Sequence, residues 1–229
     1  MLTLLTTTGC RQKAWEICEK LMTNQVYEGQ VRWVVVDDGE VEQTISFKRN
    51  NWDVEVVRPT HRWKLGSNTQ QKNLIAGLNR IKNTENLVII EDDDYYDPYY
   101  LQTVQNWIIT ETLVGESASR YYNLRSKKYR QLSNYFHSSL CSTALKGSAI
   151  EMLRAICITN KTLIDVNLWK MYKGSKKLYR TNMVVGLKGM DGRAGIGIGH
   201  NKDFQAKIDE DGSVFQSWLR SDVSLYEQH

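Results

Sequence analysis

The chain has 229 residues, with 30 Lys and Arg against 26 Asp and Glu, and hydrophobic residues make up 41% of it. This length and composition suit one globular domain and exclude a disordered chain. No apolar run reaches about 18 residues, so the sequence predicts no membrane span.

The first part of the chain alternates between strand-like and helix-like patterns. Short apolar and β-branched runs predict strands, and apolar residues spaced three and four apart predict helices. In chain order we expect a strand at 2–7, a helix at 14–22, strands at 31–36 and 53–57, a helix at 69–81 and a strand at 87–90. This alternation predicts an α/β fold with a mostly parallel sheet flanked by helices.

Downstream the patterns are weaker. We expect helices at 99–112 and 150–158, a glycine-rich loop with short extended pieces at 183–200, and a short amphipathic helix or frayed tail at 215–225. Only two prolines and no low-complexity tract occur, so no internal linker is predicted.

The cysteines and the N-terminal residues bear on the cellular compartment. The four cysteines are dispersed and include no C-x-x-C pair, which fits neither a zinc site nor a disulfide framework. The first residues lack the charged region and apolar core of a signal peptide. We therefore expect free thiols and a cytoplasmic protein, in the host cytoplasm if the chain is viral.

Charge is divided unevenly along the chain. The windows 117–150 and 166–190 hold many Lys and Arg but no Asp or Glu, so acidic residues are in excess elsewhere. A basic region beside an acidic one indicates a polyanionic ligand on one side and a metal ion on the other. The alternative is ordinary solvated surface charge.

Polar residues stand at the ends of three predicted strands, namely Thr6 to Thr8, Asp37 with Asp38, and Asp92 to Asp94. Open parallel sheets bind ligands outside the carboxyl ends of their strands. The sequence therefore predicts a ligand site at this edge of the sheet.

The stretch Glu91 to Asp94 is the most informative in the chain. Four consecutive carboxylates repel one another, and a divalent cation explains them better than folding does. Asp92 and Asp94 can project to the same side and offer oxygen ligands to Mg²⁺ or Mn²⁺. The alternative is a solvated acidic turn. An EF-hand and a phosphate-binding P-loop are excluded, because neither pattern is present.

These features occur in a known order: a first strand ending in threonines, Val34 to Gly39, a helix with Lys72 and Asn73, and then Val88 to Asp94. This order resembles the nucleotide-sugar half of family-2-type glycosyltransferases, over about residues 1–105. The resemblance implies a single Rossmann-like GT-A domain. Residues 1–105 would bind the nucleotide sugar and residues 106–229 the acceptor.

The resemblance also implies roles for individual residues in binding a nucleotide sugar, expected to be a UDP-sugar, and Mn²⁺ or Mg²⁺. The metal ligands would be Asp92 and Asp94, and the donor-binding residues would be Thr6, Thr8, Asp37, Asp38, Lys72 and Asp93. Asp38, or its neighbour Asp37, would bind the base. Without the resemblance, Asp37 and Asp38 would be read as an Asx-type turn ending a strand.

An inverting transferase needs a base to deprotonate the acceptor hydroxyl. Asp165 loosely matches the family segment that carries this base, although Ile164 replaces the usual acid beside it. Apolar neighbours are expected to raise the pKa of Asp165 toward a useful range. The alternative roles are a helix N-cap or a structural ion pair. Inversion follows only from the resemblance.

The glycine-rich loop ends at His200, which the resemblance suggests as a third metal ligand. Arg193, in the same loop, could add positive charge at the diphosphate. His137 has less context and is expected to be structural or on the acceptor side.

Aromatic residues alternate with the cations of both basic windows, as in Tyr121, Tyr135 and Trp169. Such mixtures suit nucleic acid, in which bases stack and phosphates are neutralised, and also carbohydrate. A phage-type transferase that glycosylates hydroxymethylated bases in DNA satisfies both signals, and it would flip the base out. The alternatives are a transferase acting on a cell-surface glycan, a nucleotidyltransferase and a non-catalytic nucleic-acid-binding protein. The oligomeric state is not indicated.

Overall fold

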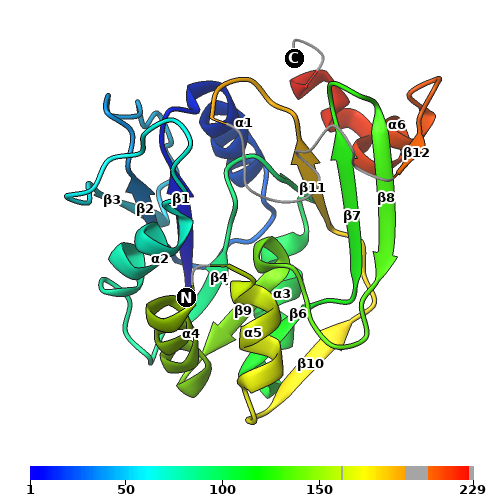
Figure 1. The fold of residues 1–229 in the computed structure, drawn as a ribbon. Coiled ribbons are helices and arrows are strands. Elements are labelled where there is room, and N and C mark those ends of the chain that lie inside the picture. Colours follow the sequence, from blue (N-terminus) through cyan, green and yellow to red (C-terminus); the bar gives the residue numbers. More distant parts are fainter. Residues whose placement is uncertain (161, 194–205, 227–229) are drawn as a thin grey trace.

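The computed structural model describes residues 1–160, 162–193 and 206–226 (Figure 1). Its strands are β1 Leu2–Thr8, β2 Val31–Asp37, β3 Trp52–Val57, β4 Asn86–Ile89, β5 Tyr95–Tyr96, β6 Leu113–Glu116, β7 Ala118–Asn123, β8 Lys128–Ser133, β9 Thr143–Lys146, β10 Lys176–Tyr179, β11 Val184–Lys188 and β12 Lys207–Ile208. Its helices are α1 Gln12–Thr23, α2 Gln70–Leu78, α3 Tyr100–Thr110, α4 Ser148–Thr159, α5 Ile164–Met171 and α6 Ser213–Leu219, with 3-10 turns η1 Leu140–Ser142 and η3 Arg220–Leu225.

The larger sheet has seven strands in the order β10-β6-β9-β4-β1-β2-β3. Strands β3, β2, β1 and β4 are parallel, and β9 runs antiparallel between β4 and β6. Successive side chains of β1 enter opposite cores: Leu4 packs with α1 and α3, whereas Leu5 packs with α2, α4 and α5. This mixed α/β architecture, a mostly parallel sheet flanked by helices, confirms the predicted fold class.

A second, five-stranded sheet has the order β12-β8-β7-β11-β5. The sequence did not predict it, because most of its strands carry mixed polar residues. Strand β5 follows the acidic turn Glu91 to Asp94 directly and pairs with β11. The acidic turn therefore connects the two sheets.

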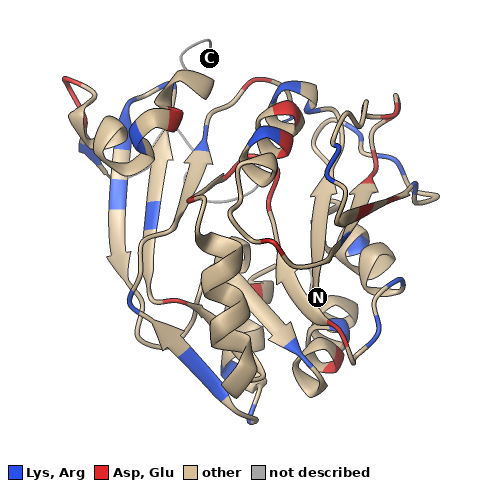
Figure 2. Ribbon diagram, turned by 180° about the vertical axis from the view of Figure 1, so that it is seen from behind, with Lys and Arg blue, Asp and Glu red and all other residues tan. Residues whose placement is uncertain are grey.

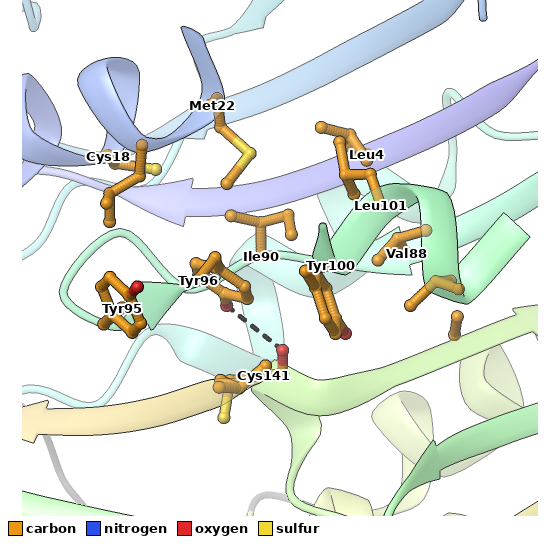
Figure 3. Packing of buried hydrophobic residues seen from close by; sticks show 14 of the residues in the cluster. Leu4, Cys18, Met22, Val88, Ile90, Tyr95, Tyr96, Tyr100, Leu101 and Cys141 are labelled. Atoms are coloured by element: carbon orange, nitrogen blue, oxygen red, sulfur yellow. Dashed lines mark hydrogen bonds between the residues drawn. The ribbon is translucent and has the colours of Figure 1, made fainter. Parts of the chain in front are cut away.

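The core under this turn is shown in Figure 3, where Leu4, Met22 and Leu101 surround Ile90. The Tyr96 hydroxyl donates to the carbonyl of Cys141 (3.2 Å) and accepts from the backbone N–H of Glu91 (2.8 Å). A fully buried tyrosine thus fixes the first residue of the acidic turn against η1.

Most predicted elements of the first half are present with shifted ends. The helix expected at 69–81 ends at Leu78, and the extended piece expected in the glycine-rich region is β11. The sequence reading did not propose α5. All four cysteines are free, as expected. No helix among the described residues is long and apolar enough to cross a membrane.

Candidate active site at the carboxyl ends of the strands

The polar ends of β1, β2 and β4 meet at one edge of the large sheet. Strand β1 pairs in parallel with both neighbours, so its last residue, Thr8, lies between the other two ends. The Thr8 hydroxyl donates to Asp92 Oδ2 (2.7 Å), and the Thr8 carbonyl accepts from the backbone N–H of Asp38 (3.2 Å). The predicted convergence of these residues is therefore present.

Close packing after β1 explains a glycine there. Gly9 has a φ of +141°, and a Cβ atom on it would lie 2.3 Å from Asp38 Oδ1. Only glycine permits this approach of the backbone to the Asp38 carboxylate.

The two acids after β2 have different surroundings. Asp37 accepts from the backbone N–H groups of Gly39 (2.9 Å) and Gln43 (2.8 Å) and pairs with Arg58, so it holds its own loop together. Asp38 instead pairs through Oδ1 with Arg193 (2.7 Å), and its Oδ2 accepts from Thr69.

Within the acidic turn, Asp92 and Asp93 face Arg11. Arg11 Nη1 lies 2.7 Å from Asp92 Oδ1 and 3.2 Å from Asp93 Oδ2. Burial raises the pKa of Asp92, and Arg11 opposes that rise. This arginine follows β1 and holds two of the four acids.

Asp94 points to the other side, toward the second sheet. Its Oδ1 accepts from Lys188 Nζ (3.0 Å) and from the backbone N–H of Leu187 (2.9 Å), while its buried Oδ2 has no hydrogen-bond partner within the described part of the chain. Ligand atoms of Asp94, Glu91 and Cys141 lie within 4.8 Å of one another. An unsatisfied carboxylate oxygen beside a second carboxylate suits a divalent cation.

Burial and neighbouring charges strongly shift the pKa values of Glu91 and Lys188. Burial, and then the nearby Asp94, raise the pKa of Glu91 well above its usual range. Burial lowers the pKa of Lys188, but Asp94, Asp93 and Glu91 outweigh that effect and raise it well above normal. Lys188 therefore stays protonated and offsets part of the acidic charge.

Asp165 lies in the first turn of α5. Burial raises its pKa, and the hydrogen bond from the backbone N–H of Val166 and then the charge of His137 oppose that rise. Asp165 also contributes, less than burial and Asp94 do, to the raised pKa of Glu91. The N-cap residue of α5 is Leu163, and no salt bridge to Asp165 occurs among the described residues. Asp165 is therefore neither the N-cap residue of this helix nor part of an ion pair with a described residue.

The remaining predicted residues differ in their surroundings. Thr6 is fully buried, and its hydroxyl accepts from the Trp33 indole (2.9 Å). Lys72 lies exposed on α2. His200 lies outside the described residues. Arg193 reaches Asp38 and also donates to the Thr69 hydroxyl (2.7 Å).

Sequence reasoning did not single out Arg11 or Lys188 and gave Glu91 no role of its own. Arg11 had a usable signal, since it follows Thr8-Gly9 in the loop after the first strand. Lys188 had none, because only the pairing of β11 with β5 and β7 brings it to Asp94.

No protein-family model matches the chain, and no curated protein does. Solved structures do share its fold. TarS 1–349 of S. aureus in complex with UDP aligns with a TM-score of 0.57 at 14% identity, over 82% of this chain and 60% of that one. The complex of TarS 1–349 with UDP-GlcNAc gives 0.54 at 13%, over 98% and 73%. Mannosyltransferase PcManGT of Pyrobaculum calidifontis, with GDP-Man and Mn²⁺, gives 0.51 at 13%, over 82% and 56%.

The chain spans 36% of the longer TarS chain and 60% of TarS 1–349 with UDP. Its fold is thus the GT-A-like fold of these structures.

Proposed function

We propose that the protein transfers a sugar from a nucleotide-diphosphate sugar to an acceptor hydroxyl. One observation carries the proposal: Asp38 and the acids Asp92 to Asp94 gather, buried, at the carboxyl edge of a GT-A-like sheet. Neighbours with this fold hold UDP, UDP-GlcNAc, or GDP-Man with Mn²⁺. We take the donor to be a UDP-sugar.

The donor lies along the ends of β1 and β2. Asp38, with Asp37 shaping its loop, binds the base, and Thr8 belongs to the nucleoside end. The buried Thr6 supports this end of β1 through its hydrogen bond with Trp33. Arg193 and Lys72 supply positive charge for the diphosphate. Binding of the donor exchanges the ion pair of Asp38 with Arg193 for contacts to the nucleotide.

The residues of the acidic turn fit a divalent cation, Mn²⁺ or Mg²⁺. The unpartnered Oδ2 of Asp94 and the carboxylate of Glu91 supply hard oxygen ligands, with Asp92 and His200 as further candidates and Asp93 beside them. A bound cation would stabilise the negative charge of the leaving diphosphate.

Asp165 removes the proton from the acceptor hydroxyl as that oxygen attacks the anomeric carbon. Burial raises the pKa of Asp165, which brings it closer to the range in which a carboxylate acts as a base. Attack on the face opposite the diphosphate inverts the anomeric centre.

For the acceptor we propose a hydroxymethylated base in DNA. Both basic windows reach the surface of the second half: Figure 2 shows Lys and Arg on β7, β8 and β10. A cell-surface glycan is the rival acceptor. Incubation of hydroxymethylated DNA and of a glycan with UDP-sugars separates them, and sugar transfer to the glycan alone would exclude DNA.

The donor half is tested by thermal stability with Mn²⁺, with UDP, and with both. Stabilisation by UDP that requires Mn²⁺ is expected, as is Mn²⁺-dependent hydrolysis of a UDP-sugar in preference to GDP- and dTDP-sugars. The variant Asp94→Asn should lose more than about 100-fold of this hydrolysis, because a metal ion supplies several kcal/mol of charge stabilisation.

Asp53→Asn is the matched control, since Asp53 is exposed at the start of β3, far along the strand from its carboxyl end. Equal activity of the two variants would contradict the proposal. Absence of any UDP effect in the wild-type protein would favour the nucleic-acid-binding module, and pyrophosphate release from a nucleoside triphosphate would favour a nucleotidyltransferase.

A further inference from the structure

A cavity of about 700 Å³ lies on the second half of the molecule, between the segment before η1, helix α5 and strand β10. This volume is in the range of about 300–1,000 Å³ that small-molecule sites occupy. Its lining residues are Tyr135, Phe136, His137, Val166, Trp169, Lys170, Lys176, Lys177 and Leu178.

Two neighbouring aromatic residues at this cavity are almost fully open to solvent. The exposed fraction is 80% for Tyr135 and 85% for Phe136. Single exposed apolar residues are common, but adjacent exposed aromatic rings at the rim of a cavity mark a surface that meets a partner. Flat rings of this kind offer a stacking surface for a planar group.

The charge of the cavity is positive. Lys170, Lys176 and Lys177 line it, and none of its lining residues is acidic. Lys176 Nζ donates to the carbonyls of Trp169 (2.6 Å) and Tyr172 (2.8 Å), so its charge is fixed in place at the end of α5. Lys170 is exposed. The cavity therefore favours an anionic ligand.

The cavity adjoins the proposed base. Val166, which lines it, follows Asp165 in α5, and His137, which also lines it, is close enough to influence the Asp165 carboxyl. The cavity therefore reaches the turn of α5 that carries Asp165, on the side of the second basic window, although Asp165 is not itself a lining residue.

The cavity combines aromatic stacking surfaces and positive charge with a place next to the helix turn that carries the proposed general base. Nucleic acid is a ligand class that fits all three features. We propose that this cavity binds a DNA strand with one unstacked base, which stacks on Tyr135 or Phe136 while its phosphates meet Lys170 and Lys177. The role of this cavity as the acceptor site rests on the proposed function, whereas its binding of DNA can be measured without a donor.

Fluorescence anisotropy of a labelled oligodeoxythymidylate tests the binding directly. The double variant Tyr135→Ala/Phe136→Ala is expected to bind the strand at least about tenfold more weakly, because stacking on an aromatic ring contributes about 1–3 kcal/mol per base. Tyr99→Ala is the matched control, since Tyr99, the N-cap residue of α3, is 61% exposed and lies outside the cavity. Both substitutions are at exposed positions, so the fold is retained.

The lysines give a second readout. Lys170→Glu/Lys177→Glu should weaken binding and make it less sensitive to salt, whereas Lys48→Glu, at an exposed position in the loop before β3, should not. An abasic strand of equal length should bind more weakly than the oligodeoxythymidylate. Equal affinity for the abasic strand or for polyphosphate would overturn stacking, and unchanged binding by both double variants would overturn the cavity as the site.

Failure of this inference can be told from failure of the proposed function. Normal Mn²⁺-dependent UDP binding with no DNA binding would overturn only the inference. DNA binding at the cavity without any UDP binding would support it as a DNA site and overturn the proposed transfer.

Discussion

The two halves of the molecule place their charges differently. In the half up to residue 105, the acids Asp37, Asp38 and Asp92 to Asp94 lie in short loops directly after buried parallel strands, and they are buried. In the half from residue 106, the cations lie on exposed strand faces and helix ends, as on β8 and β10. The first arrangement concentrates charge at a point, and the second spreads it over a surface.

The halves are nevertheless joined at the acidic site. Four cations pair with its carboxylates among the described residues: Arg11, Arg58, Lys188 and Arg193. Two of the four, Lys188 and Arg193, come from the second half. The first half therefore balances only part of the charge of this site, so changes on either side of the site should affect the other.

The largest expected effect comes from Asp165. Asp165→Asn should lower kcat by about 100- to 10,000-fold, the usual contribution of a general base, while Mn²⁺-dependent UDP binding is unchanged. In the wild-type protein kcat should fall as the pH drops through the raised pKa of Asp165, because the base must be deprotonated. Measurements of kcat for the wild-type protein and for Asp165→Asn over a series of pH values check both predictions.

Glu151→Gln is the control for Asp165→Asn, since Glu151 is an exposed acid of the neighbouring helix α4. A kcat that survives Asp165→Asn would show that the second half does not supply the base, and the halves would then not divide donor from acceptor chemistry.

The next largest effect concerns Lys188. Lys188→Met leaves the buried Asp94 carboxylate without its counter-charge, which should cost about 3–5 kcal/mol of the free energy of unfolding. At this chain length the loss corresponds to roughly 10 °C or more in Tm. Calorimetry or a thermal melt measures it.

A double variant isolates the pair. Lys188→Met/Asp94→Asn should recover part of the lost stability, because both charges are gone. If Lys188→Met alone melts at the same temperature as the wild-type protein, the second half does not stabilise the acidic turn. That result would contradict the claim that the ion pair of Lys188 with Asp94 links the two halves.

The sequence predicted the first half better than the second for a physical reason. Strands such as β1 and β2 are buried on both faces, so they appear as continuous apolar runs, and the acids that follow them mark their ends. Thr8, Asp38 and Asp92 were thereby predicted to meet, and they do.

The second half depends on contacts that no local pattern reveals. Strand β9 inserts between β4 and β6. Strand β7 pairs in parallel with β11, and the paired residues Arg120 and Val185 are more than sixty positions apart in the chain. The pairing of β11 with β7 brings Lys188 to Asp94, and the pairing of β10 with β6 places one wall of the cavity. The sequence could suggest a basic, aromatic half but not where its residues meet.

The smallest effect expected here concerns Glu91. Burial and Asp94 raise its pKa above the unfolded value, so its contribution to stability is fully present below the unfolded pKa and is lost as the pH rises through the folded pKa. At neutral pH the buried Glu91 carboxyl is therefore unfavourable, because either keeping it ionised or protonating it costs free energy. Glu91→Gln should stabilise the metal-free protein by about 1 kcal/mol near pH 7, and the gain should disappear in acid.

The same substitution should have the opposite effect once Mn²⁺ and UDP are present, because Glu91 is one of the proposed ligands. Thermal melts of wild-type protein and Glu91→Gln with and without Mn²⁺ and UDP, with Asp53→Asn as the control, measure both effects. A variant that is stabilised equally in both conditions would show that the carboxylate is not a ligand. A variant destabilised in both would show that Glu91 serves the fold, and the charge concentrated in the first half would then need an explanation other than a metal ion.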